Sequence, residues 1–181
     1  IYSVGVVFCL LLGQVFACSG PDKFVKELVG EVTKDIERYS EESVLVDKLG
    51  KRLERISDAD YASAKILGSH YRGLSSSEKE KFKSKLSAYV VVGYIKALRQ
   101  VDSRNKLKVY PFRGSGGQVA TVRTKYTARS GKRVRMDFIL ICLGNKWKVQ
   151  DVSIEGVRVV DGYVSQLRPV LEESGMNGLL A

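Results

Sequence analysis

The spacing of the apolar residues changes near residue 100 of this chain, and that change limits the folds it can adopt. Before residue 100 the apolar residues recur every three or four positions, which is typical of amphipathic helices. After Asp102 they alternate with polar residues, which is typical of half-buried strands. A chain that places its helices first and its strands second favours an α+β fold.

Four helices are expected in the first half of the chain, over residues 24–39, 44–56, 60–71 and from the serine run 75–77 to about residue 98. Gly93 lies in the middle of the last of these helices. A glycine there costs about 1 kcal/mol against alanine, so we expect Gly93 to allow close packing of another element.

Four strands are expected in the second half, over residues 106–112, 118–128, 132–143 and 146–157. The turn signals at residues 129–131 and 144–145 predict an antiparallel meander. A last helix is expected over residues 161–173, ending at the glycine C-cap signal of Ser174 and Gly175. The expected fold therefore packs N-terminal helices and a C-terminal helix on a curved, four-stranded antiparallel sheet.

The third expected strand is apolar on both faces past Asp137, through Ile139, Ile141 and Leu143 on its second face. A strand of this kind is either covered by helices on both sides or lines an apolar pocket between the sheet and the helices. The pattern alone leaves both interpretations open, and we expect the sheet and helices to enclose an apolar pocket.

The first seventeen residues carry no charge and contain a short apolar stretch over residues 4–12. This stretch is too short for a transmembrane helix, which needs about 20 apolar residues. It ends in Val15-Phe16-Ala17, which has the layout of a signal-peptide cleavage site. We expect residues 1–17 to be an N-terminally truncated signal peptide and residues 18–181 to form one exported domain; the alternative is a buried core segment.

The chain has three cysteines and one histidine, too few and too scattered for a Cys/His zinc site. Cys9 lies in the expected signal peptide, and Cys18 follows its cleavage position, where a lipobox would lead to acylation. Phe16 fits a lipobox poorly. Cys18 and Cys142 could pair in an oxidising compartment. We favour instead Cys142 as a small apolar core residue of the third strand.

The net charge of +10, from 30 basic and 20 acidic residues, predicts an anionic partner. Every basic residue follows the expected signal peptide, so this charge is expected outside the cytoplasm. We therefore expect no nucleic-acid partner, and we favour an anionic membrane surface or an acidic protein.

Two segments of the chain carry a family resemblance. Residues 147–158 read WKVQDVSIEGVR and lead into a Tyr163-x-x-Gln166 helix, and residues 66–82 read ILGSHYRGLSSSEKEKF. In this order, over about residues 24–180, they resemble the MlaC, or toluene-tolerance, family of periplasmic phospholipid-binding proteins. The chain departs from the family's pattern at residues 70–71, where the family often has Trp, and at Phe138, which lacks a tyrosine hydroxyl.

The resemblance implies a monomeric periplasmic phospholipid carrier that is not an enzyme and needs no metal or cofactor, with the bound phospholipid as its cargo. In the family, the carrier exchanges lipid with an inner-membrane ABC transporter complex and an outer-membrane lipoprotein–porin complex, and so maintains outer-membrane lipid asymmetry. A two-chain lipid hides about 30 methylenes, each worth roughly 0.8 kcal/mol, so such a carrier needs comparable apolar burial.

Twelve apolar or aromatic residues are our candidates for the lipid pocket, and for each the alternative is an ordinary core position. They are Leu67, Tyr71, Phe82, Tyr89, Tyr94, Val122, Tyr126, Met136, Phe138, Leu140, Trp147 and Val149. Four basic residues on neighbouring strands are candidates for binding lipid headgroups or docking acidic partners, and their alternative is a solvated strand face. They are Arg123, Lys125, Arg133 and Arg135.

Three other functions remain to be compared with the carrier. A hydrolase would have to use His70, the only histidine, but the chain has no G-x-S-x-G elbow. A cone-fold isomerase would use an Asp base in its pocket, with Asp137 the nearest candidate; we favour a salt bridge from Asp137 to Arg135 or Arg123. An envelope adaptor that binds only proteins would have a filled core.

Overall fold

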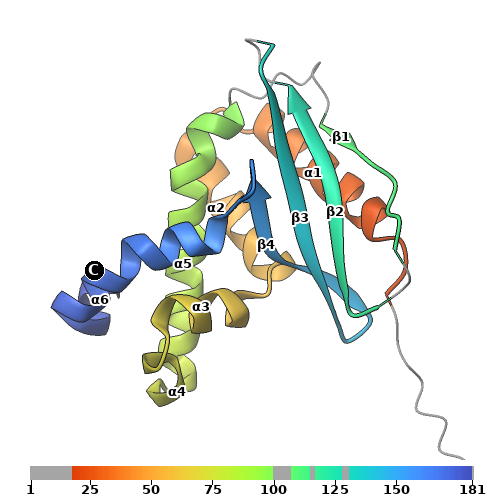
Figure 1. Ribbon diagram of the computed structural model, residues 1–181. Coiled ribbons are helices and arrows are strands. Elements are labelled where there is room, and N and C mark those ends of the chain that lie inside the picture. Colours follow the sequence, from red (N-terminus) through yellow and green to blue (C-terminus); the bar gives the residue numbers. More distant parts are fainter. Residues whose placement is uncertain (1–17, 100–106, 115–116, 128–130, 181) are drawn as a thin grey trace, which may run out of the picture.

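The computed structural model describes residues 18–99, 107–114, 117–127 and 131–180 (Figure 1). The expected signal peptide lies outside these residues. The described part has six helices and five strands: α1 (Pro21–Arg38), α2 (Glu42–Ile56), α3 (Ala59–Leu67), α4 (His70–Gly73), α5 (Ser76–Arg99), β1 (Lys108–Val109), β2 (Val119–Thr127), β3 (Arg133–Leu143), β4 (Lys146–Ile154), β5 (Val157–Arg158) and α6 (Val159–Leu180). Helices, an antiparallel sheet and a closing helix confirm the α+β fold.

The sheet has five strands in the order β1-β2-β3-β4-β5, and every neighbouring pair is antiparallel. The expectation of four strands is therefore wrong. Glu155 and Gly156 both adopt a positive φ, 50° and 89°, and form a turn inside the last expected strand. Because the backbone reverses there, β4 ends at Ile154 and the chain returns along it as β5.

Two expected helices also have different limits. Gly68, at φ 58°, ends α3 at Leu67, so the single helix expected over residues 60–71 is in fact α3 followed by the one-turn α4. The C-terminal helix does not end at Ser174. Gly175 leaves helical geometry, at φ 63° and ψ −165°, but the chain resumes a helix and continues to Leu180. Gly175 was recognised as a helix end, but the helix that resumes after it was not predicted, and neither was the break at Gly68.

The helices pack on the sheet in two groups (Figure 1). Helix α1 covers one face of β2 and β3 and forms an apolar cluster with them that includes Val25, Leu28, Val122 and Leu140. Helices α2, α3, α5 and α6 lie on the β4 side of the sheet. Their apolar residues form two further clusters, one between α2 and α5 and one among α3, α5 and α6. The boundary between α5, α6 and the sheet is where the candidate site lies.

A disulfide joins Cys18 to Cys142, the residue near the end of β3. Cys142 is buried, as expected, but our preference for an unpaired core cysteine is wrong, because its thiol is bonded to a residue 124 positions away. Trp147 of β4 adds a hydrogen bond from its indole Nε1 to the carbonyl of Ser19, at 3.1 Å. The start of the described chain is therefore attached to this end of the sheet.

In the described ranges, no helix combines the length and the apolar character needed to cross a membrane. Across the same residues, no three His, Cys, Asp or Glu side chains come close enough together to hold a metal ion.

Candidate functional site

A groove of about 570 Å³ lies between α5, α6 and the hairpin of β4 and β5. Most of its lining residues are apolar or aromatic: Tyr89, Val92, Gly93 and Tyr94 from α5, Ile154, Val157 and Arg158 from the hairpin, and Val159, Gly162, Tyr163 and Gln166 from α6. Tyr89, Val92 and Val157 are 48%, 54% and 68% exposed. The groove is therefore an apolar surface that faces solvent, a feature that marks binding sites more often than chance exposure.

Close packing of α6 against α5 forms the floor of the groove. A Cβ atom on Gly93 would lie 3.3 Å from the hydroxyl oxygen of Tyr163, a tight contact, so glycine lets the Tyr163 hydroxyl approach α5 without displacement. This agrees with the role expected for Gly93. The Tyr163 ring also meets the Tyr89 ring edge to face, with centroids 5.7 Å apart.

Asp151 of β4 organises the polar end of the groove. Its side chain is completely buried, and its Oδ1 atom accepts hydrogen bonds from the backbone N–H groups of Val152, at 2.8 Å, and Val160, at 3.1 Å. Val160 lies in the first turn of α6, so the carboxylate satisfies a donor that a helix start leaves unpaired. Its Oδ2 atom accepts a hydrogen bond from Nε of Arg158, at 2.7 Å.

The groove carries a positive charge and neutral hydroxyl donors at neutral pH. Burial by itself lowers the pKa of Arg158, but the hydrogen bond and charge of Asp151 outweigh it, and the net pKa is raised. Burial raises the pKa of Tyr94 and Tyr163, with smaller contributions from Asp151 at Tyr94 and from the other tyrosines at Tyr163. Both phenols therefore stay protonated.

A second cavity of about 110 Å³ lies deeper in the molecule, between the α2–α3 connection, α3, α5 and β4. It shares Val159 and Tyr163 with the groove. The α2–α3 connection is held to the sheet at Val149, whose carbonyl accepts a hydrogen bond from the backbone N–H of Asp58 at 2.9 Å. Val159 and Tyr163 thus form a wall with a cavity on each side.

The twelve expected pocket residues lie in different parts of the molecule. Tyr89 and Tyr94 line the groove, and Val149 lines the deeper cavity. Three more lie in the cluster of α3, α5 and α6, next to the groove: Leu67, Tyr71 and Phe82. Five, besides Val149, belong to the cluster between α1 and the sheet: Val122, Met136, Phe138, Leu140 and Trp147. Tyr126 is half-buried on β2. Contact of any of them with lipid stays a prediction.

Sequence reasoning missed most of the groove, including Val92, Val157, Arg158 and Tyr163. One signal was present, because Tyr163 and Gln166 belong to the helix pattern that carries the family resemblance. The others come from three separate segments. Neither helical nor strand periodicity indicates that such segments meet.

The four expected basic residues are grouped on β2 and β3, on the sheet face opposite α1. Lys125 pairs with Arg135 in the strand register, and Arg123 pairs with Asp137. Nε of Arg135 lies 3.3 Å from Oδ2 of Asp137, which is the salt bridge favoured from the sequence. Arg123, Arg133 and Arg135 are exposed and none of the four lines the groove.

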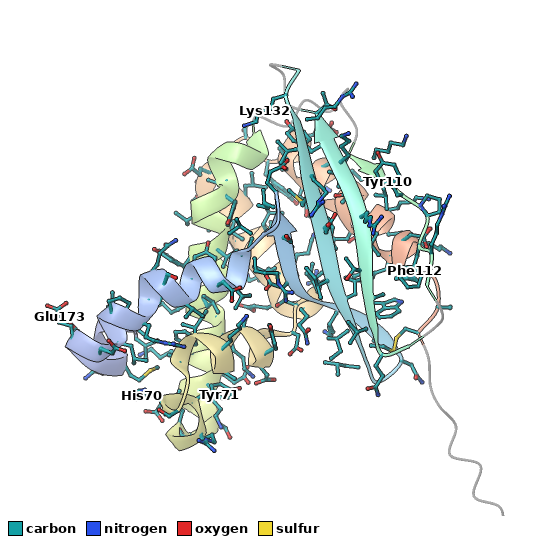
Figure 2. All side chains as sticks on the ribbon, in the orientation of Figure 1. His70, Tyr71, Tyr110, Phe112, Lys132 and Glu173 are labelled. Carbon is teal, nitrogen blue, oxygen red and sulfur yellow. A yellow bond between two sulfur atoms is a disulfide. The ribbon has the colours of Figure 1, made fainter. Side chains whose placement is uncertain are left out.

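The two residues that an enzyme would use also lie outside the groove. Asp137 is on the outer sheet face, where its Oδ1 atom is buried without a hydrogen-bond partner among the described residues. His70 is exposed in α4, at the far end of the helical layer (Figure 2).

Another protein with this α+β architecture has been solved with a bound phospholipid. The structure superposes on a phospholipid-binding protein from Ralstonia solanacearum, solved in complex with a phospholipid, with a TM-score of 0.72, over 88% of this chain and 92% of that one, at 21% identity. The sequence model of the MlaC protein matches residues 22–181. This chain belongs to the MlaC family, as its two motifs suggested.

Two curated relatives agree with this assignment. The toluene tolerance protein ttg2D of Pseudomonas putida is 24% identical over 151 residues, which are 82% of this chain and 70% of that protein. The intermembrane phospholipid transport system binding protein MlaC of Haemophilus influenzae is 25% identical over 125 residues, which are 67% of this chain and 58% of that protein.

Proposed function

We propose that this protein is a periplasmic phospholipid carrier and that the groove between α5, α6 and the β4–β5 hairpin is its lipid site. The observation that carries the proposal is the group of exposed apolar residues along the groove, because a protein that binds nothing there gains no stability from them. The printed names of the Haemophilus relative and the Ralstonia neighbour, which describe phospholipid transport and binding, support it.

The groove volume suits part of a two-chain lipid. At about 570 Å³ it lies within the roughly 300–1,000 Å³ of typical ligand sites. The second cavity extends the apolar space behind Tyr163 and Val159. Rotation of the Tyr163 side chain would join the two cavities and let an acyl chain pass between α3, α5 and β4, where Val149 and Val152 line the wall.

The polar groups of the groove suit binding rather than catalysis. Its lining offers an arginine, three tyrosines and a glutamine, but no nucleophile paired with a base. A carrier needs no such pair and no cofactor, because transfer between a membrane and an apolar site breaks no covalent bond. We therefore propose that the protein is not an enzyme.

In this proposal, the protein carries phospholipid between an outer-membrane lipoprotein–porin complex and an inner-membrane ABC transporter complex. The disulfide supports a location in an oxidising compartment such as the periplasm. It also occupies the Cys18 thiol, which lipid anchoring at that residue would require, and so argues against acylation of Cys18. The exposed basic residues of β2 and β3 offer a docking face for acidic partners or for anionic headgroups.

Native mass spectrometry of the exported protein tests the lipid site. We expect co-purified phospholipid on the wild-type protein, and at least about tenfold less on Val92→Asp, because an unpaired carboxylate in an apolar site costs several kcal/mol. The matched control is Val170→Asp, which places the same charge on an exposed valine of α6 outside the groove. Wild-type protein that is always lipid-free would refute the proposal, as would equal loss in both variants.

A further inference from the structure

The groove has one cationic side chain among its described lining residues, that of Arg158, and no carboxylate. The side chain is about one third exposed and extends from β5, the short strand that begins the return of the hairpin. A charged side chain does not strengthen the binding of acyl chains in an apolar groove. The pairing with Asp151 accounts for Nε of Arg158 but not for its two terminal nitrogens.

We propose that Arg158 binds the phosphate group of the lipid and so makes the groove selective for glycerophospholipids over neutral diacyl lipids. This inference rests on the proposed function and adds the chemical feature that the site recognises. It assigns the headgroup to a residue outside the basic face of β2 and β3. That face is then left for docking.

The guanidinium of Arg158 has donors to spare. It carries five N–H groups in a planar fork. Asp151 engages only Nε, and among the described residues no other hydrogen bond to this guanidinium is found. Both terminal nitrogens are therefore available for two parallel hydrogen bonds to phosphate oxygens, which is the geometry in which arginine binds phosphate.

Asp151 holds the fork in place before the ligand arrives. The carboxylate is itself fixed by the backbone N–H groups of Val152 and Val160, so it cannot follow Arg158 towards solvent. Fixing Nε reduces the rotamer freedom that Arg158 would lose on binding a phosphate. Asp151 is thus a positioning residue, and the phosphate contact belongs to Arg158.

The charges around Arg158 leave room for an anion. Asp161, in the first turn of α6, is another carboxylate whose charge acts on Arg158, and its Oδ1 atom lies 2.6 Å from Nζ of Lys65 in α3. Glu155, in the hairpin turn, accepts a hydrogen bond from the backbone N–H of Arg135. The hydroxyls of Tyr94 and Tyr163, which also line the groove, are neutral donors and add no repulsion.

A competition between two lipids with the same acyl chains tests the proposal. Protein is incubated with vesicles that contain dioleoyl phosphatidylglycerol and dioleoylglycerol in equal amounts, and native mass spectrometry gives the ratio of the two bound lipids. Arg158→Met alone would leave Asp151 buried without its cation, so the test variant is Asp151→Asn with Arg158→Met. Its matched control is Asp151→Asn alone, which keeps the cation.

We expect wild type to prefer phosphatidylglycerol. The single variant should keep a weaker preference, because its cation is present but no longer held by the carboxylate, and the preference of the double variant should fall about tenfold or more below that of wild type. An unchanged ratio in a folded double variant would overturn the proposal. If wild type takes up neither lipid, the carrier function itself fails, and the two failures are therefore distinct.

A measurement on wild-type protein avoids any folding defect. The Nε–H resonance of Arg158, assigned by its absence in Arg158→Lys, should shift in the NMR spectrum on loading with phosphatidylglycerol and not with dioleoylglycerol. Inorganic phosphate alone, at millimolar concentration, should not reproduce the shift. If it does, or if both lipids shift the signal equally, Arg158 does not recognise the phosphate of a bound lipid.

Discussion

At the scale of single residues, carboxylates hold neighbouring elements and side chains in position. Asp151 links the hairpin, the start of α6 and Arg158 through one buried carboxylate. Tyr71 lies at the far end of the helical layer (Figure 2). There a second carboxylate, that of Asp60, contacts both Tyr71 and Lys83. The hydroxyl of Tyr71 donates to Asp60, and Nζ of Lys83 lies 2.7 Å from the same carboxylate.

The Tyr71 hydrogen bond predicts a pH-dependent difference in stability. Burial, then the hydrogen bond to Asp60, raises the pKa of Tyr71 to about 12, above its unfolded value of about 10. Because the folded pKa is the higher one, the stabilisation is present below about pH 10 and is lost as the pH rises to about 12. We expect Tyr71→Phe to be less stable than wild type by about 1 kcal/mol at pH 8.

Urea unfolding of both proteins between about pH 8 and pH 11.5 measures this difference, which should shrink over the range. Other groups titrate there as well, but their effects cancel in the comparison. Tyr110→Phe is the control, since that tyrosine lies near β1 and away from Asp60 (Figure 2). A gap between wild type and Tyr71→Phe that does not change with pH would show that ionisation of the Tyr71 hydroxyl is not linked to folding.

At the scale of elements, the attachment of the N-terminal segment depends on a covalent bond. The disulfide closes a loop of 124 residues between Cys18, before α1, and Cys142, on β3. A bond that closes a long loop limits the freedom of the unfolded chain, and its removal typically costs about 2–5 kcal/mol. Helix α1 packs on the same sheet, so the bond and the apolar cluster stabilise one layer.

We expect Cys18→Ser with Cys142→Ser to unfold at a lower urea concentration than the oxidised wild type, by about 2–5 kcal/mol in free energy. Reduction of the wild type should lower its stability by a similar amount, and reductant should leave the double variant unchanged. Hydrogen exchange should increase first at residues 18–20, where Trp147 then holds the chain alone. Equal stability of oxidised and reduced wild type would contradict the expectation.

At the scale of the whole molecule, the groove and the basic residues of the sheet lie in different regions. The groove lies between α5, α6 and the β4–β5 hairpin, and the basic residues of β2 and β3 lie on the sheet face opposite α1. Arg135 is adjacent to both regions, because its backbone exchanges hydrogen bonds with Glu155 of the hairpin. A partner docked on the basic face would therefore lie close to the hairpin.

We expect Arg123→Glu with Arg133→Glu to slow lipid delivery to phosphatidylglycerol vesicles several-fold at low salt, while lipid retention stays unchanged. The difference should fade as salt is added, because screening acts on exposed charges. The matched control is Lys26→Glu with Lys81→Glu, which reverses two exposed charges on α1 and α5. Equal slowing in both variants would show that net charge matters and that the basic face does not.

Local signals predicted much of the fold. The three-four spacing located α1, α2 and α5 to within a few residues, because it reflects one buried helix face. The alternation located β2 and β3 for the corresponding reason. The turn at Glu155 was missed because the residues on both sides of it, Ile154 and Val157, are apolar and were assigned to one strand. The disulfide bond of Cys142 was not predicted either, because the residues around Cys142 do not indicate contact with a cysteine 124 positions away.

The sequence by itself determined the order of helices and strands, the α+β class and the family, because periods, turns and motifs are properties of consecutive residues. Only the tertiary structure decided which apolar residues are exposed to solvent. Val92 and Val157 carry the same apolar side chain as core valines. They line a groove because Gly93 admits Tyr163 and because Asp151 sets where α6 begins, so that α6 crosses α5 and leaves the two valines uncovered.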